Sequence, residues 1–220
     1  MINLCRSNNE AANLVASGNL RRAYRILQDA TKTACRALSV LDTDDDSEMA
    51  GNATIEEQVL VTAVKISGLK YEESNVFLHA FAIQEDRINE WDVHAKLPSI
   101  CAILICNMAI CCHGFFYTTQ DCRKRQQALA QARQLYSEAA DVLQHLDLSG
   151  CLGQVFLGIC NNMVEVAYED GNLDNVQHWY SLLSDAFSGS KTSTYDPALC
   201  RSAFRSVVYY SGNMVSARAA

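Results

Sequence analysis

The chain has 220 residues with 49% hydrophobic residues, only two Pro and ten Gly, and a formal net charge of -7. This length suits a single domain, and the composition argues against a disordered chain and against a turn-rich β-sandwich, so it predicts an all-α protein. The negative charge lies within 42–57, and elsewhere the acidic residues balance the 18 Lys and Arg, so there is no positive field that would favour nucleic acid as a partner.

A tripeptide that occurs twice in one context indicates an internal repeat. Gly18-Asn19-Leu20 follows Asn9 by nine residues, and Gly171-Asn172-Leu173 follows Asn162 by nine. In both copies apolar residues recur at helical spacing on either side of the glycine. This pattern predicts two helices joined at a glycine turn.

The first hairpin is expected over 1–40, with helices at 4–17 and 20–40. Gly18 is expected to end the first helix in the left-handed conformation, which costs a glycine little. Residues 41–98 form an acidic loop and an irregular connector. Within the connector, Thr54 and Glu57 have capping-box spacing, and 59–61 could equally be a short strand. Residues 76–83 are ambiguous. If they are extended, we expect them to lie along the helices as a connector and not to form a sheet.

A second, elongated hairpin is expected over 99–145, in which an insertion of eleven residues lengthens both arms around Gly114. A third hairpin follows over 151–187, with its turn at Gly171. A C-terminal capping helix is expected over 195–212, because Asp196-Pro197 is an N-cap followed by proline at the first helical position. The domain is therefore one stack of antiparallel helix hairpins over 1–220.

These units resemble the tetratricopeptide repeat, in which apolar residues on a first helix, a glycine at the turn and small or aromatic residues on a second helix recur. The matching positions are Ala11, Leu14, Gly18, Leu20, Ala23, Leu27 and Ala30; Asn107, Met108, Ala109, Cys112, Ala132, Tyr136 and Ala139; and Asn162, Met163, Ala167, Gly171, Leu173, Val176 and Tyr180. The resemblance covers about half of the chain. It implies a right-handed stack whose concave face binds a partner peptide or helix, with no catalysis.

The first helices of the three units should line this concave groove. The resemblance places eight candidate residues there: Asn8, Ala12, Cys106, Ile110, His113, Asn161, Glu165 and Tyr168. They offer amides and an acid but almost no cations, so a clamp for a terminal carboxylate is not expected. The recurring Asn9, Asn107 and Asn162 are either peptide-binding amides or structural ones that bond to the backbone of the next helix, and we favour the structural interpretation.

Catalytic and metal-binding signals are weak. Asp42, Asp44 and Asp46 imitate the start of a calcium loop, but Ser47 and Ala53 stand where the loop requires Gly and Glu. Cys106 and His113 share a helix face about 10 Å apart, too far for one zinc ion without other elements. We therefore expect no cofactor, no metal and no enzyme activity. A Cys/His enzyme remains the alternative, because such pairs meet only in the fold.

Two further expectations concern location. Ten cysteines without a secretory signal segment predict reduced thiols in a cytoplasmic, reducing compartment. The apolar stretch 97–117 is long enough to span a bilayer, so a membrane-attached protein is a second alternative. Asn107 at its centre favours a buried helix instead. The sequence thus predicts a non-catalytic protein-protein interaction or scaffold module.

Overall fold

The computed structural model describes residues 1–41, 59–66, 75–84, 93–148, 150–189 and 195–218. Within them the chain is mostly helical, which confirms the expected helical character. The helices are α1 (Ile2–Ala16), α2 (Leu20–Leu41), α3 (Val93–Thr118), α4 (Cys122–Gln144), α5 (Cys151–Glu169), α6 (Leu173–Gly189) and α7 (Pro197–Arg218), and two strands, β1 (Val61–Lys65) and β2 (His79–Ile83), lie between α2 and α3. The acidic segment 42–57, with its capping box and its calcium-like aspartates, lies outside the described residues.

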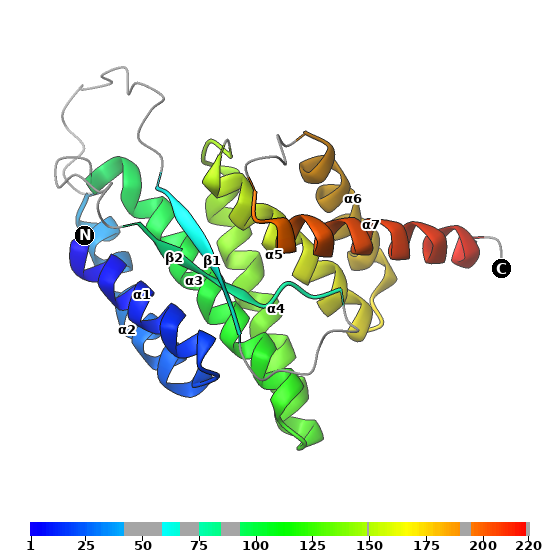
Figure 1. Ribbon diagram of the computed structural model, residues 1–220, viewed down its shortest axis with the longest axis horizontal. Coiled ribbons are helices and arrows are strands. Elements are labelled where there is room, and N and C mark those ends of the chain that lie inside the picture. The colour runs from blue at the N-terminus through cyan, green and yellow to red at the C-terminus, as the bar shows by residue number, and fades with distance from the viewer. Residues whose placement is uncertain (42–58, 67–74, 85–92, 149, 190–194, 219–220) are drawn as a thin grey trace.

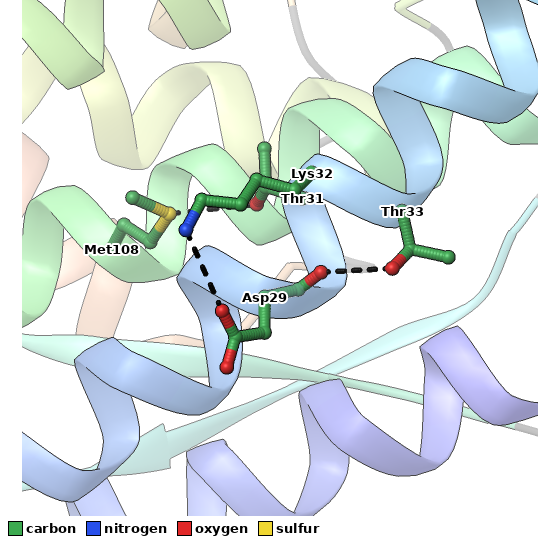
Figure 2. A network of polar contacts seen from close by, with 5 residues as sticks. All are labelled: Asp29, Thr31, Lys32, Thr33 and Met108. Atoms are coloured by element: carbon green, nitrogen blue, oxygen red, sulfur yellow. Dashed lines mark hydrogen bonds and ion pairs between the residues drawn. The ribbon is translucent and has the colours of Figure 1, made fainter.

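The helices pack on one another in chain order, from α1 and α2 at one end, through α3 and α4, to α5, α6 and α7 at the other (Figure 1). One continuous hydrophobic core runs through all of these elements. The α2–α3 contact joins the first pair of helices to the second, and Figure 2 shows part of it. There the Thr31 hydroxyl donates a hydrogen bond to Met108 Sδ at 3.4 Å, while the neighbouring Asp29 and Lys32 form an exposed ion pair.

Two glycine turns have the predicted conformation. Gly18 has a φ of 77° and Gly171 a φ of 68°. At the first turn the N–H of Gly18 donates to the carbonyl of Val15 and the N–H of Asn19 donates to the carbonyl of Leu14. The helix ends there because a left-handed residue turns the chain back onto its last free carbonyl groups. The following helices, α2 and α6, therefore return antiparallel to α1 and α5.

The predicted turn at Gly114 is wrong. Helix α3 continues through Gly114 to Thr118, and the chain turns only before the N-cap Asp121. Gly114 is not among the glycines with positive φ, and it is buried against α2. A Cβ atom at this position would lie 2.8 Å from Leu20 Cδ1. The glycine therefore permits close approach of two helices instead of ending one.

The apolar helix α3 lies in the core. By length and composition Lys96–Thr118 could cross a membrane, but 94% of that window is buried inside the protein. The surrounding elements that cover it include α2, α4 and β2. A helix that is apolar on all sides is expected at the centre of a helical stack, and the packing of α3 agrees with that interpretation.

Helix α7 begins as predicted. The Asp196 carboxylate accepts hydrogen bonds from the N–H groups of Ala198 at 2.7 Å and Leu199 at 3.1 Å. Arg201 and Arg205 of this helix are exposed. The opposite face of α7 packs on α5 and α6.

The expectation that 76–83 would not take part in a sheet is wrong. Strands β1 and β2 form an antiparallel pair in which Val61 lies opposite Ile83 and Lys65 lies opposite His79. The pair crosses the front of α3 and leads toward α5 and α7 (Figure 1). Strand formation follows from the Val and Thr residues of β1 and the Phe and Ile of β2, which favour a pleated, half-buried surface.

Candidate functional site

Residues 75–83, here called the inserted segment, cross the first helices of all three hairpins in an extended conformation. One edge of the segment pairs with β1. Gln84 N–H donates to the carbonyl of Leu60 at 2.9 Å, and Ile66 N–H donates to the carbonyl of Leu78 at 3.3 Å. In an extended chain the main-chain groups of successive residues point to opposite edges. The main-chain N–H and C=O groups of the even-numbered residues therefore point to β1, and those of Phe77, Phe81 and Ile83 point to the helices.

Three asparagines, here called the amide ladder, bind this second edge. Asn162 of α5 bonds to Phe77, Asn107 of α3 bonds to Phe81, and Asn9 of α1 bonds to Ile83. In each case Oδ1 accepts from the N–H and Nδ2 donates to the carbonyl of the same residue, at distances from 2.7 to 2.9 Å. A carboxamide has one acceptor and one donor side by side, so it matches the two main-chain groups that one extended residue presents on an edge. The amide ladder thus replaces a neighbouring strand.

Two further asparagines, each preceding a member of the amide ladder, extend this network. Asn8 Nδ2 donates to the Phe81 carbonyl at 2.8 Å, and Asn8 Oδ1 accepts from Asn107 Nδ2 at 2.8 Å. Asn161 Nδ2 donates to the Asn75 carbonyl at 2.9 Å, and Asn161 Oδ1 accepts from the hydroxyl of Ser206 at 2.8 Å. Asn8, Asn107, Asn161 and Asn162 are buried, where an unpaired polar group would be costly, and Asn9 is half-buried.

The side chains of the inserted segment are seated on α5. Phe77 and Phe81 are almost completely buried, with ring centroids 6.0 Å apart. Gly158 makes room for them, because a Cβ there would lie 3.2 Å from Phe81 Cζ and 3.5 Å from Phe77 Cδ1. His79 stacks on Phe77 at 4.2 Å, and burial lowers the pKa of its imidazole to about 4. His79 is therefore neutral at physiological pH.

The predicted groove residues do not all meet the inserted segment: Asn8 and Asn161 bond to it, whereas His113 and Cys106 lie near Tyr136 of α4. Six of the eight are buried inside the protein: Asn8, Ala12, Cys106, Ile110, His113 and Asn161. Glu165 is half-buried and accepts a hydrogen bond from the Tyr210 hydroxyl of α7 at 2.6 Å, and burial raises the pKa of its carboxyl. Tyr168 alone among the eight is exposed, at 45%. The predicted set therefore does not line an open groove in the part of the chain that the structure describes.

A buried polar chain continues from the amide ladder into the core. Asn162 Nδ2 donates to the Tyr136 hydroxyl at 2.9 Å, and that hydroxyl lies 3.4 Å from His113 Nδ1. Burial lowers the pKa of His113 to about 3, so the ring is neutral. The other ring nitrogen of His113, Nε2, has no hydrogen-bond partner among the described residues.

The environment of the cysteines bears on the Cys/His hypothesis. Burial raises the pKa of Cys106 well above its usual range, so this thiol stays protonated at neutral pH. A protonated thiol is a poor nucleophile and a poor metal ligand. Among the residues that the structure describes, no three His, Cys, Asp or Glu side chains gather as a metal site would require.

The sequence identified the recurring asparagines but not what they bind. We expected Asn9, Asn107 and Asn162 to bond to the backbone of the next helix, and they bond to the inserted segment instead. The pairs Asn8-Asn9 and Asn161-Asn162 occupy equivalent places in the first and third hairpins, and this doubling is the signal that could have indicated an extended ligand. No comparable signal marks Gly158, Phe77 or Phe81, because their relation depends on tertiary packing.

No family model, no curated protein and no solved structure matches this chain.

Proposed function

We propose that this protein is a non-catalytic interaction module, a tetratricopeptide-like stack of helix hairpins whose concave face holds an extended protein segment. The observation that carries this proposal is the amide ladder. Each of its three asparagines bonds both main-chain groups of one residue in an extended chain. Main-chain hydrogen bonds of this kind provide affinity for an extended segment whatever its sequence, as in strand addition.

The polar groups on this face favour binding over chemistry. The amides are neutral at every accessible pH, so they supply neither a proton nor a nucleophile. The titratable groups near the amide ladder are His79, Tyr136, His113 and Cys106, and burial keeps the two imidazoles neutral and the phenol and the thiol protonated. We place the module in a reducing, cytosol-like compartment, because all ten cysteines are free thiols.

A partner protein is the expected ligand class. The basic clusters at 21–25 and 123–125 are exposed on helix surfaces and do not line the concave face, which gives no support for a nucleic-acid partner. Tyr168, which is 45% exposed, and the half-buried Glu165 lie on α5 beside Tyr210 of α7, beyond Asn161 and Asn162. We therefore expect a bound partner to contact these two residues first.

The test combines cross-linking with a measured affinity. A photoreactive phenylalanine analogue in place of Tyr168 should cross-link partners in extracts of the source cells, and each partner identified should then be purified. Calorimetry with the full-length chain should give a Kd that weakens at least tenfold in Asn161→Ala or Glu165→Ala. The matched control is Gln134→Ala, on the exposed face of α4. Partners that bind all of these variants equally would contradict a concave-face site.

A further inference from the structure

The inserted segment has the contacts of a bound peptide. The edge that does not pair with β1 is bound by side-chain amides from α1, α3 and α5, and not by helix backbone. Those amides contact only N–H and C=O groups of the segment, so they would hold any extended chain in the same register. The remaining edge pairs with β1 through ordinary strand hydrogen bonds, which are equally independent of sequence.

The side chains of the segment show which ligand the face selects. Phe77 and Phe81 are four residues apart and are buried together over Gly158. Ile83 follows two residues later and is also buried, and the small Ala80 lies between the aromatic positions. Leu78 is completely buried as well, so the site accommodates aromatic side chains at positions one and five, aliphatic ones at positions two and seven, and a small residue at position four.

We propose that the inserted segment is an intramolecular ligand, and that the concave face binds in its place an extended partner segment with two aromatic residues four apart and an aliphatic residue two further on. This inference rests on the proposed function and specifies its ligand. The partner segment runs in the direction of β2, antiparallel to β1. One of its edges forms the hydrogen bonds to β1, and the other forms those to the amide ladder.

The apparent affinity for a partner segment depends on its competition with the inserted segment. A tethered ligand acts at an effective concentration of roughly millimolar, so a free peptide meets a face that is already occupied. If the competent, empty state is populated at about 1%, the apparent Kd is about a hundredfold weaker than the intrinsic Kd. Weakening the inserted segment without touching the helices should then strengthen binding of a peptide added from outside.

The experiment uses the full-length chain and a fluorescently labelled peptide with the sequence of residues 75–83. Phe81→Ala removes a ring of the resident segment and leaves the helical face unchanged. By fluorescence anisotropy this variant should bind the peptide at least tenfold more tightly than the natural chain. Gln84→Ala, which alters the exposed residue that follows the segment, is the matched control and should behave like the natural chain.

Peptide variants test the aromatic pattern. The same peptide with both phenylalanines replaced by alanine should bind Phe81→Ala at least tenfold more weakly. Equal binding of the peptide to Phe81→Ala and the natural chain, or equal binding of the alanine peptide, would overturn the proposal. A dimer that forms with rising concentration and takes up no peptide would mean that a second copy fills the face, and would overturn the partner assigned to it.

A second measurement covers the case in which Phe81→Ala does not fold. Hydrogen exchange of the natural chain reports the opening free energy of the Phe77, Phe81 and Ile83 amides. Exchange at a lower free energy than the α3 amides supports a displaceable ligand, and exchange only with global unfolding overturns it. If these amides exchange only with global unfolding but Glu165→Ala still weakens the binding of a purified partner, the interaction function stands. Only the intramolecular-ligand inference is then lost.

Discussion

The carboxamide of Asn107 bonds both main-chain groups of Phe81, 26 residues away along the chain: Oδ1 lies 2.8 Å from the N–H nitrogen and Nδ2 lies 2.9 Å from the carbonyl oxygen. Both groups are buried at the centre of the molecule. The contact joins the central helix to the inserted segment, and Asn8 joins the same carbonyl from the first hairpin.

Asn107→Leu should destabilise the protein strongly. The substitution keeps a similar volume but leaves the buried N–H of Phe81 without an acceptor and Asn8 Oδ1 without a donor. An unsatisfied buried polar group costs about 1–3 kcal/mol, so we expect the free energy of unfolding to fall by roughly 2–5 kcal/mol. Urea denaturation measures it. The exposed control Gln134→Ala should change stability by less than about 0.5 kcal/mol, and a similar small effect of Asn107→Leu would contradict the role of the amide.

Gly158→Ala should disturb the inserted segment. The added methyl would approach the Phe81 ring to 3.2 Å, and such overpacking costs about 1–3 kcal/mol. We expect a lower melting temperature together with faster hydrogen exchange at the Phe77 and Phe81 amides. The matched control is Gly189→Ala at the end of α6, where the added methyl meets nothing within 4 Å. Equal effects of the two substitutions would show that the seat on α5 tolerates an extra atom.

Acid should destabilise the protein through His113. Burial holds its pKa near about 3 in the folded state, whereas an unfolded histidine titrates near about 6.5. Between these values the unfolded chain binds the extra proton. The stability due to neutral His113 is therefore fully present above about pH 6.5 and is lost as pH falls toward 3, by up to about 1.4 kcal/mol per pH unit.

His113→Gln isolates this contribution. Glutamine can still hydrogen-bond to the Tyr136 hydroxyl but does not titrate. Denaturation at several pH values should give a slope between pH 6 and 4 that is smaller in His113→Gln by about 1.4 kcal/mol per pH unit. His178→Gln changes an exposed imidazole and serves as control. Parallel slopes for His113→Gln and the natural chain would mean that His113 is already accessible to protons in the fold.

Thiol reactivity should follow burial. Burial raises the pKa of Cys101 and of Cys112 to about 12, and it also raises those of Cys106, Cys111 and Cys160. At pH 7.5 we expect iodoacetamide to label the exposed Cys35 and Cys122 first and these five of the six buried thiols only after denaturation, as read by mass spectrometry. Rapid labelling of Cys106 or Cys112 in the native protein would favour the Cys/His enzyme hypothesis.

The burial of α3 predicts how the expressed chain fractionates. Because most of Lys96–Thr118 is covered by other parts of the protein, little of its apolar surface remains for lipid. We expect the chain to stay in the supernatant after extraction in salt without detergent and high-speed centrifugation. Recovery only with detergent would favour the membrane-attached alternative.

Local signals in the sequence predicted the elements that depend on local chemistry. The turns at Gly18 and Gly171 follow from a conformation that glycine adopts at little cost, and the start of α7 follows from the Asp196 cap. Gly114 looked similar in sequence, but its lack of a side chain serves a contact with Leu20. Spacing along one helix cannot distinguish a glycine that ends a helix from a glycine that allows two helices to approach.

The candidate site was predictable only in part, because its central relationship is between residues far apart in the chain. Asn162 and Phe77 are 85 residues apart, and nothing near either residue indicates the other. The apolar stretch 76–83 has strand-forming residues but no clear alternation of apolar and polar positions, since both of its faces are buried. Its sequence therefore fits a strand, a connector or a buried helix equally well.

The amide ladder has a further consequence for solubility. Residues 76–83 contain no proline, no glycine and no charged Asp, Glu, Lys or Arg, which is the composition of a segment that readily stacks into fibrils. Such stacking usually begins at an unpaired strand edge, where free N–H and C=O groups can pair with another chain. Here β1 pairs with one edge of the segment, and the other edge bonds to carboxamides, which cannot extend a strand. Because both edges are occupied, pairing of this aggregation-prone segment with further chains is hindered.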